Sequence, residues 1–336
     1  MTLVREIRFA KRPQGVPTRD CFALAEVDLP DPGPGQVQVR NLWMSVDPYM
    51  RGRMNEMGPG YTTAFQLGAP LEGRAVGEVV ASNDPSLKVG DIVFSDLGWR
   101  EAFNADPAAL RKLDLQGLPA EAFLGVAGMP GLTAYAGLLR TAALKSGDIV
   151  LVTAAAGAVG MYACQIAKLR GHTVIGTAGG AAKVRYLREE LGLDAAVDYR
   201  EHEGRLTEAF RAAAPDGIDV CFENVGAEHL EAAINVARPF ARFALCGMIS
   251  QYNSTAQPYG VRNLMLLMGK QIRLEGFIVR SHTDMMDDLV RDVRGWVADG
   301  KFKLRDTVFE GLDNAPDAFL GLFTGANLGK ALVRLS

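Results

Sequence analysis

A short run rich in alanine and glycine, Ala155-Ala156-Gly157-Ala158-Val159-Gly160, has the spacing of a phosphate-binding turn with alanine in place of the first glycine. In the full G-x-G-x-x-G pattern, the second glycine lets the backbone approach a pyrophosphate, and the third allows close helix–strand packing. The helix N-terminus then faces the negative charge. Gly157 and Gly160 stand at those two positions, so the run predicts a dinucleotide site, although an Ala-rich turn also suits a plain strand-to-helix connection.

The residues about twenty positions further on bear on the choice of dinucleotide. A site for NAD places Asp or Glu there, against the adenosine ribose. This chain instead has Thr177-Ala178-Gly179-Gly180, followed by Lys183 and Arg185. A 2′-phosphate would therefore meet positive charge, and NADPH is the predicted cofactor. Lys183 is expected to make the contact, whereas Arg185 fits a solvated helix residue equally well.

No metal site is expected. The cysteines, Cys21, Cys164, Cys221 and Cys246, stand far apart, and the four histidines are equally dispersed. Zinc sites need such ligands at paired, short spacing. We interpret the cysteines as small buried apolar residues in a reducing compartment. Three of the four histidines stand beside charged or turn residues, where a solvated side chain is the commoner state.

The predicted turn needs a strand before it and a helix after it. Asp148 to Thr153 contains the continuous apolar run typical of a buried parallel strand. Apolar residues then recur at helical spacing from Val159 to Ala167, and Gly171 would end that helix. Further strands are expected at 172–178, 194–199, 219–225, 242–248 and 272–279, with helical segments between most of them.

This alternation from 128 to 301 predicts βαβ units and an α/β fold with a Rossmann-type doubly wound parallel sheet. Residues 1–127 differ, because Gly and Pro interrupt short apolar runs, which indicates a β-rich domain. Residues 302–336 return to β-like runs at 306–309 and 330–334, and we expect them to complete the first domain. Two domains are the usual arrangement for a chain of 336 residues.

Charge and hydropathy limit the partners. The net charge of −3 comes from 36 basic and 39 acidic residues mixed along the chain, so nucleic acid is not expected. The longest runs without charged or amide side chains, 122–139 and 149–164, are shorter than the ~20 apolar residues that span a bilayer. The first residues contain scattered charges and no apolar core of a secretory signal. The expected location is the cytoplasm.

Several separated motifs together resemble one known family. They are SVDPYMRGRM at 45–54, GMPGLTAYAGL at 128–138, AAAGAVG at 154–160, FENVG at 222–226, LCGMISQYN at 245–253, EGFIV at 275–279 and NLGKALV at 327–333. Over its full length the chain resembles the zinc-independent medium-chain dehydrogenase/reductases, in the group of prostaglandin reductases (leukotriene hydroxydehydrogenases), plant alkenal double-bond reductases and bacterial curcumin reductases. The resemblance implies a GroES-like β-rich catalytic domain and an NADP-binding Rossmann domain.

Carried over by position, the resemblance also implies contacts to NADPH. Lys183 and Tyr199 would bind the adenosine 2′-phosphate, and Asn224 would lie near the nicotinamide. Asn224 suits an ordinary turn as well, and Phe277 an ordinary core position. The other implied contacts are Cys246, Gly247, Met248, Ile249 and Ser250 along the nicotinamide ribose, Phe277, Ile278 and Val279 beside the nicotinamide ring, and Asn327 over the cofactor.

The implied activity is reduction of the carbon–carbon double bond of α,β-unsaturated ketones or aldehydes. Hydride adds to the β-carbon, negative charge develops on the carbonyl oxygen, and a preorganised hydrogen-bond donor should stabilise it. Tyr252 matches the family tyrosine with that role, shared with the ribose 2′-hydroxyl of the cofactor, and solvent would protonate the α-carbon. Tyr49 and Tyr61 are expected to line the substrate pocket.

Two other functions stay open at this point. A quinone reductase uses the same cofactor scaffold, and only the shape of the pocket decides between the two acceptors. A non-enzymatic NADPH-binding protein would share the fold without the activity. The resemblance further implies a homodimer formed through the edge strand near 272–279.

Overall fold

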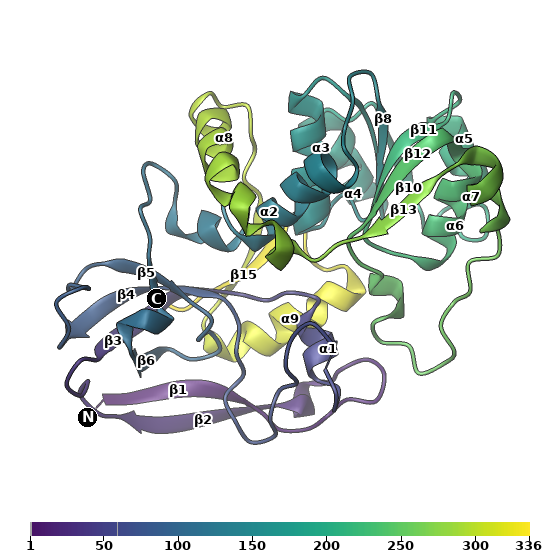
Figure 1. The fold of residues 1–336 in the computed structure, drawn as a ribbon. Coiled ribbons are helices and arrows are strands. Elements are labelled where there is room, and N and C mark those ends of the chain that lie inside the picture. The colour runs from purple at the N-terminus through teal and green to yellow at the C-terminus, as the bar shows by residue number, and fades with distance from the viewer. Residues whose placement is uncertain (1, 59) are drawn as a thin grey trace. The chain divides into compact units, whose positions relative to one another are not determined.

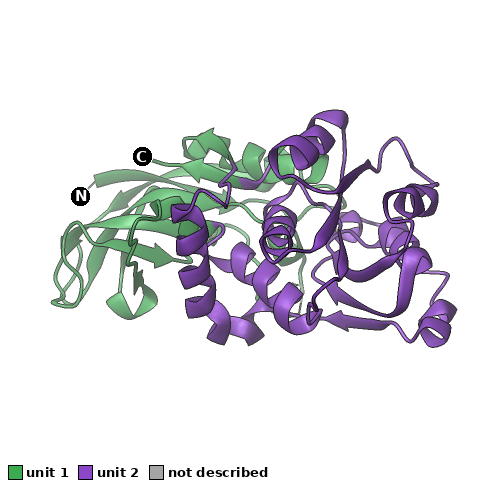
Figure 2. Ribbon diagram, turned by 90° about the horizontal axis from the view of Figure 1, so that it is seen from above, with its two compact units in different colours: residues 1–124, 306–327, 331–336 green, residues 125–305, 328–330 purple. Residues whose placement is uncertain are grey.

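The computed structural model describes residues 2–58 and 60–336, which divide into two compact units (Figures 1 and 2). Unit 1 comprises residues within 1–124, 306–327 and 331–336, and unit 2 comprises residues 125–305 and 328–330. Most of the C-terminal segment thus belongs to the same unit as the N-terminal segment. None of the helices in the described part of the chain has the length and apolar character needed to cross a membrane.

Unit 2 is built on a six-stranded parallel sheet with the order β10-β9-β8-β11-β12-β13. Counted from β8, this is the 3-2-1-4-5-6 order of a doubly wound fold, in which ligands bind beyond the carboxyl ends of the strands where the order reverses. The reversal lies between β8 and β11 (Figure 1). The predicted fold class is confirmed. The strands are β8 (Ile149–Val152), β9 (Thr173–Ala178), β10 (Ala195–Asp198), β11 (Ile218–Glu223), β12 (Ala237–Leu245) and β13 (Arg273–Gly276).

Several of the predicted strands end earlier than expected, and the largest differences are in β12 and β13. β12 ends at Leu245 rather than 248, because the N–H groups of Cys246 and Gly247 both donate to the carbonyl oxygen of Glu223 and turn the chain out of the sheet. The strand predicted at 272–279 is wrong in its second half, since β13 ends at Gly276. β13 is an edge strand, so beyond Gly276 only β12 could extend the pairing, and β12 has already ended.

Helices connect these strands. α3 follows the predicted pattern, and Gly171 after its end has φ +82°, the left-handed conformation that commonly ends a helix. α2 and α4 each continue into a single π turn, at Gly137–Thr141 and Tyr186–Glu190. The helices of unit 2 are α2 (Met129–Ala136), α3 (Ala158–Leu169), α4 (Ala181–Arg185), α5 (Leu206–Ala213), α6 (Ala227–Val236), α7 (Met265–Lys270) and α8 (Met286–Ala298), with short 3-10 segments at Ile249–Gln251 and Val279–Met285.

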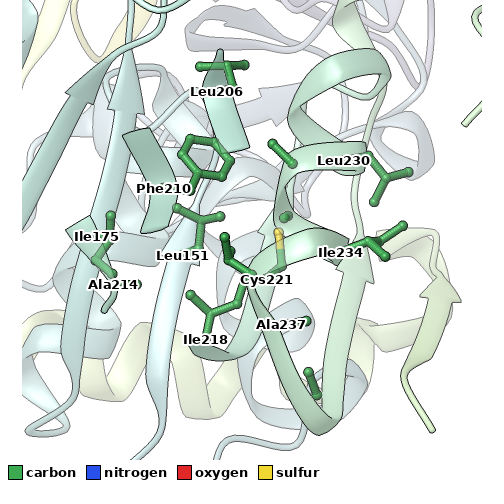
Figure 3. Packing of buried hydrophobic residues seen from close by; sticks show 14 of the residues in the cluster. Leu151, Ile175, Leu206, Phe210, Ala214, Ile218, Cys221, Leu230, Ile234 and Ala237 are labelled. Carbon is green, nitrogen blue, oxygen red and sulfur yellow. The ribbon is translucent and has the colours of Figure 1, made fainter. Parts of the chain in front are cut away.

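One face of the parallel sheet is covered by α5 and α6 (Figure 3). Leu151 of β8, Ile175 of β9 and Cys221 of β11 pack there with Phe210 of α5 and Ile234 of α6, and all five are buried. Burying a large apolar side chain contributes roughly 1.5–3 kcal/mol. This packing fixes the strands whose carboxyl ends carry most of the predicted cofactor residues.

Unit 1 is rich in β-strands, as predicted, and the structure shows that they pair in antiparallel sheets. β1 pairs with β2, and a seven-stranded sheet has the order β14-β15-β3-β4-β5-β7 with β6 on β3. The runs predicted at 306–309 and 330–334 form β14 and β15. The strands are β1 (Thr2–Phe9), β2 (Phe22–Leu29), β3 (Val37–Ser45), β4 (Ala75–Ser82), β5 (Ile92–Ser95), β6 (Ala102–Ala105), β7 (Arg111–Lys112), β14 (Asp306–Glu310) and β15 (Lys330–Arg334). The helices are α1 (Met50–Arg53) and α9 (Ala315–Thr324), with 3-10 turns at Arg19–Cys21, Pro107–Ala109, Ala120–Leu124 and Leu312–Asn314.

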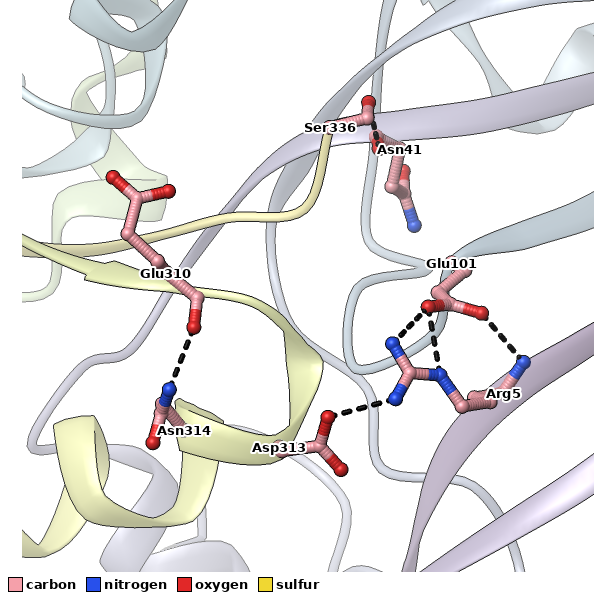
Figure 4. A network of polar contacts seen from close by, with 7 residues as sticks. All are labelled: Arg5, Asn41, Glu101, Glu310, Asp313, Asn314 and Ser336. Atoms are coloured by element: carbon pink, nitrogen blue, oxygen red, sulfur yellow. Dashed lines mark hydrogen bonds and ion pairs between the residues drawn. The ribbon is translucent and has the colours of Figure 1, made fainter.

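Polar contacts attach the C-terminal segment of unit 1 to its first strands (Figure 4). Arg5 of β1 donates to Glu101 from Nη2 at 2.6 Å and to Asp313 from Nη1 at 2.7 Å. The hydroxyl of Ser336 donates to the carbonyl oxygen of Asn41 at 3.2 Å. Partly exposed ion pairs of this kind stabilise a fold by only about 0.2–1 kcal/mol each. The pairing of β15 with β3 and the packing of Phe319 in the apolar core of the unit attach the segment as well.

Candidate functional site

The carboxyl ends of neighbouring strands in unit 2 lie side by side. Val152 of β8 pairs with Phe222 of β11, whose next residue, Glu223, pairs with Leu245 of β12, and Leu245 pairs with Gly276 of β13. Apart from Asn327, which lies in unit 1, every predicted cofactor residue comes after the carboxyl end of a strand in this six-stranded sheet. Ala156, Gly157, Ala158, Val159 and Gly160 follow β8, Lys183 follows β9, Tyr199 follows β10, Asn224 follows β11, Cys246, Gly247, Met248, Ile249 and Ser250 follow β12, and Phe277, Ile278 and Val279 follow β13.

The two glycines of the turn between β8 and α3 differ in the space around them. A Cβ on Gly160 would lie 2.3 Å from the carbonyl oxygen of Ala154, so only glycine fits there. A Cβ on Gly157 would meet the same oxygen at 3.4 Å, an ordinary contact. The fold therefore requires glycine at Gly160, whereas at Gly157 the chain leaves space. The first turn of α3 begins directly after Gly157 and offers the backbone N–H groups that bind anions at helix N-termini.

The segment Leu328–Lys330 packs on this turn, which the sequence analysis missed. The N–H of Gly329 donates to the carbonyl oxygen of Ala156 at 2.8 Å, and Gly329 forms an isolated parallel bridge with Gly157. Gly329 has φ +73°, and a Cβ there would lie 1.9 Å from the carbonyl oxygen of Arg305. The signal was present as the glycine of the NLGK motif, from which only Asn327 was carried over.

Three polar side chains gather where β9 and β10 end. A Cβ on Gly179 would lie 2.7 Å from Oη of Tyr199 and 2.8 Å from Nε of Arg200, so both side chains lie over this glycine. Burial and the positive charge of Arg200 lower the pKa of Lys183, which lies in α4, shortly after Gly179 in the chain. Lys183, Tyr199 and Arg200 thus form a corner rich in hydrogen-bond donors and positive charge.

Arg200 was also missed from the sequence, although it directly follows Tyr199. The carboxylate of Asp198 lies nearby, and its Oδ1 accepts the backbone N–H groups of Gly180 and Arg200, each at 3.0 Å. These contacts hold the two turns that carry Lys183 and Tyr199. Oδ1 of Asp198 therefore accepts hydrogen bonds from the backbone of both turns.

On the other side of the reversal point, Asn224 and Tyr252 come together around Gly247. Nδ2 of Asn224 donates to the carbonyl oxygen of Thr153 at 2.7 Å, and its backbone N–H donates to Oγ1 of Thr153 at 2.8 Å. A Cβ on Gly247 would lie 2.9 Å from Oη of Tyr252 and 3.5 Å from the carbonyl oxygen of Asn224. The half-buried hydroxyl of Tyr252 is thereby held at the carboxyl ends of β11 and β12.

Phe277 has a packing role, the alternative that the sequence left open. A Cβ on Gly137 would lie 2.5 Å from the ring of Phe222 and 2.7 Å from the ring of Phe277. The two rings meet edge to face with their centroids 6.3 Å apart, and the ring of His282 also lies edge-on to Phe277 at 5.8 Å. Ile278 is 42% exposed.

The burial of the cysteines and histidines differs partly from what the sequence predicted. Cys21, Cys164 and Cys221 are buried as predicted, whereas Cys246 is only partly buried. Burial and the charge of Glu223 raise the pKa of Cys246 to about 12, so its thiol stays neutral. The expectation that three of the four histidines are solvated is wrong. Two are buried under neighbouring elements, His172 and His229.

The predicted substrate residues lie in unit 1. Tyr49 is half-buried just before α1, with the guanidinium carbon of Arg74 5.9 Å from its ring centroid. Burial and the charge of Asp47 raise the pKa of Tyr49 to about 12. Tyr61 is 43% exposed in the segment after α1. Tyr49 is therefore a fixed side chain and Tyr61 a surface one.

Comparison with known proteins identifies the family. Two family models match, one described as the N-terminal domain of an oxidoreductase over residues 5–113 and one as a zinc-binding dehydrogenase over residues 158–294. The NADPH-dependent curcumin reductase of Escherichia coli is 40% identical over 332 residues, which cover 97% of this chain and 95% of that protein. The chain is a medium-chain dehydrogenase/reductase. The resemblance found in the sequence motifs is confirmed.

Two further relatives match this dehydrogenase/reductase over nearly its whole length. The NADP-dependent 2-alkenal reductase of Nicotiana tabacum is 41% identical over 305 residues, covering 90% of this chain and 88% of that protein. The crystal structure of CurA from Vibrio vulnificus in complex with NADPH superposes with a TM-score of 0.93 at 38% identity, covering 99% of both chains. The relatives thus include a structure with the predicted cofactor bound.

The description of the second family model names zinc, but the part of the chain that the structure describes has no cluster of metal ligands. Among residues 2–58 and 60–336 of this dehydrogenase/reductase, no three His, Cys, Asp or Glu side chains gather as they would around a metal ion. Structural and catalytic zinc sites need at least three such ligands.

Proposed function

We propose that this medium-chain dehydrogenase/reductase uses NADPH to reduce the carbon–carbon double bond of α,β-unsaturated ketones and aldehydes. The observation that carries the proposal is the order of groups along the carboxyl edge of the parallel sheet. The cationic corner follows β9 and β10, the glycine turn follows β8, and the cluster of Asn224 and Tyr252 follows β11 and β12. A dinucleotide has its 2′-phosphate, pyrophosphate and nicotinamide in that order.

The residues fit the parts of NADPH chemically. Lys183, Tyr199 and Arg200 offer two cations and a phenol to the 2′-phosphate, which favours charge-assisted hydrogen bonds. The open face of Gly157 and the start of α3 suit the pyrophosphate. On the nicotinamide side, the remaining proposed contacts are Asn224, Cys246 to Ser250 and Phe277 to Val279. Phe277 would act through its backbone and its packing. Asn327 is the last proposed contact, over the cofactor.

The acceptor class rests on the relatives and on the chemistry of the site. Proteins 40% and 41% identical to this chain are reductases of curcumin and of 2-alkenals, both named as NADP- or NADPH-dependent. NADPH, when bound, supplies the hydride for the β-carbon of the enone. Tyr252 donates a hydrogen bond to the substrate carbonyl oxygen and stabilises the negative charge that develops there. Its position against Gly247 preorganises the hydroxyl for this task.

The remaining expectations belong to the same proposal. Residues 1–127 and 302–336 would form the catalytic domain, with Tyr49 and Tyr61 in the substrate pocket, and residues 128–301 would bind NADP. The edge position of β13 supports a homodimer formed through this strand, because an unpaired strand edge can pair with a second copy. The proposed location is the cytoplasm.

A matched panel of acceptors tests the activity. NADPH oxidation, followed by its near-ultraviolet absorbance, would be measured with a medium-chain 2-alkenone, the saturated ketone and a simple quinone, and the products would be identified. Conversion of the enone alone to the saturated ketone is the expected result. Turnover of the quinone alone would favour a quinone reductase, and NADPH binding without any turnover would favour a non-enzymatic binding protein. Alcohol formation from the saturated ketone would contradict the proposed chemistry.

A further inference from the structure

Glu223 is a fully buried carboxyl group that has no role in the proposed reduction. It is the last residue of β11, between β8 and β12, and its side chain has no exposed surface. Placing a carboxylate in such an interior is strongly unfavourable unless several hydrogen-bond donors compensate. A plain core position at the end of a parallel strand would hold an apolar residue instead.

Three donors converge on a single oxygen of this carboxyl group. Oε1 of Glu223 accepts the hydroxyl of Thr153 at 2.9 Å and the backbone N–H groups of Val225 at 2.6 Å and Gly226 at 2.8 Å. The thiol of Cys221 lies 3.8 Å from Oε2. Burial raises the pKa of Glu223, and the three donors act against this rise. The carboxyl group thus binds the turn after β11 and the end of β8 at one point.

The groups held in this way are those that present the proposed nicotinamide contacts. The hydroxyl group of Thr153 donates its hydrogen to Glu223. The oxygen of that hydroxyl group accepts the backbone N–H of Asn224 at 2.8 Å. The carbonyl oxygen of Glu223 accepts the N–H groups of Cys246 at 2.9 Å and Gly247 at 3.1 Å. Gly247 is the residue against which the hydroxyl of Tyr252 lies.

The turn after β11 also makes backbone contacts to the segment after β12. The carbonyl oxygen of Asn224 accepts the N–H of Ile249 at 3.1 Å, and that of Val225 accepts the N–H of Ser250 at 3.2 Å. A displacement of the turn would therefore move residues 246–252 with it. Three of the proposed cofactor segments, at the ends of β8, β11 and β12, share Glu223 as their common attachment.

We propose that Glu223 is a positioning residue for the nicotinamide half of the cofactor site. It acts through the turn at 224–226 and through Thr153, and it sets where Asn224 and the segment 246–252 stand. The proposal rests on the proposed function, because it assigns Glu223 a role in the binding of NADPH. Its consequence is that changes at Glu223 alter NADPH affinity separately from the stability of the fold.

Two substitutions at Glu223 distinguish the effect of losing the acceptor oxygen from the effect of losing the negative charge. Glu223→Gln keeps an acceptor oxygen for all three donors and places an amide beside the weakly accepting thiol of Cys221. Glu223→Leu removes the acceptor, leaves the Val225 and Gly226 N–H groups unsatisfied and leaves the Thr153 hydroxyl with only its long contact to the carbonyl oxygen of Phe222 at 3.5 Å. We expect the leucine variant to raise the Kd and KM for NADPH by at least about tenfold, the effect of losing a charge-assisted hydrogen bond, with a smaller change in kcat. Glu223→Gln should restore most of the affinity.

Asp148 offers a matched control in the same sheet. It is buried just before β8, at the amino end of the strand, where Oδ2 accepts the backbone N–H of Lys145 at 2.6 Å and Nη2 of Arg242 at 2.5 Å. Asp148→Leu also removes a buried, hydrogen-bonded carboxylate, but far from the carboxyl edge. It should lower the Tm and leave the Kd for NADPH unchanged, measured by fluorescence titration well below the Tm of each variant.

The outcomes separate this proposal from the proposed function. If Glu223→Leu lowers the Tm while the Kd and KM for NADPH stay at the wild-type values, Glu223 serves stability alone and the positioning role is overturned. If Glu223→Leu does not fold, Thr153→Val, which replaces the hydroxyl with a methyl group, provides the test and should raise the Kd for NADPH. A wild-type chain that does not bind NADPH would overturn the proposed function itself.

Discussion

The ring of His229 lies edge-on against the ring of Tyr199, with the centroids 5.1 Å apart and the planes inclined by 70°. Phe210 contacts the same imidazole from α5, and Nε2 of His229 is buried with no hydrogen-bond partner among the residues that the structure describes. Burial lowers the pKa of His229 to about 4 from its ordinary 6.5. A neutral imidazole is therefore part of the support beneath the proposed 2′-phosphate contact.

This burial predicts an acid-sensitive fold. Between pH 6.5 and about 4 the unfolded chain binds a proton at His229 that the folded chain does not. The free energy of unfolding should therefore decrease as the pH falls through this window, by up to about 3 kcal/mol from this residue, and the full contribution is present above pH 6.5. Urea unfolding at a series of pH values measures the slope. His229→Phe, which suits the aromatic surroundings, should flatten it, and an unchanged slope would contradict the assignment to His229.

Replacing the two glycines of the turn after β8 should have different effects, on stability at Gly160 and on NADPH affinity at Gly157. A methyl group on Gly160 collides with the carbonyl oxygen of Ala154, so Gly160→Ala should lower the stability by at least about 1–3 kcal/mol, the usual effect of overpacking. Gly157→Ala meets only an ordinary contact within the chain and should keep the wild-type Tm. Its methyl group would instead obstruct the approach of the pyrophosphate and raise the Kd for NADPH.

Thermal unfolding and NADPH titration of the two variants, side by side, measure these effects. The pair controls for the substitution itself, since each adds one methyl group to the same turn. Wild-type NADPH affinity in Gly157→Ala would show that the open face of Gly157 is not used by the cofactor.

The local part of the site was predictable from the sequence because it depends on neighbours along the chain. The apolar run into β8, the glycine turn and the helical spacing of α3 lie within about twenty residues, and each has a periodic signal. The strands of the sheet were recognised for the same reason. The failure at 277–279 arose because the apolar residues there continue the strand pattern, while the partner strand β12 has already ended at Leu245.

The parts that were missed depend on contacts between distant segments. Arg200 lies over Gly179, and Gly329 lies on the turn at Ala156, but neither pairing has a signal in local periodicity. Burial of His229 was missed because Glu228 and Glu231 stand near it in the sequence, whereas Tyr199 and Phe210 cover it from other elements. Glu223 was read only as part of a motif, since its three donors are visible only in the folded chain.

Lys183 should determine the preference for NADPH. Lys183→Ala is expected to weaken NADPH binding by about 1.5–3 kcal/mol, the range for a hydrogen bond to a charged group, and to leave NADH binding nearly unchanged. The exposed Arg185, on the same helix, provides the control, and Arg185→Ala should have a smaller effect on NADPH. Titration of each variant with both cofactors gives the comparison. Equal losses for NADPH and NADH in Lys183→Ala would overturn the assignment.

Tyr252 should contribute to the reduction step without being indispensable. Tyr252→Phe keeps the ring against Gly247 and removes only the hydroxyl. Because the cofactor ribose hydroxyl shares the stabilisation of the oxygen, kcat/KM for an enone should fall by less than the ~10²–10⁴-fold that follows removal of a positioned acid–base group. Tyr259→Phe is the matched control, since its hydroxyl donates to Glu231 at 2.7 Å on the surface and should not affect kcat/KM. Steady-state kinetics at saturating NADPH measure both variants, and an unchanged kcat/KM in Tyr252→Phe would remove this hydroxyl from the mechanism.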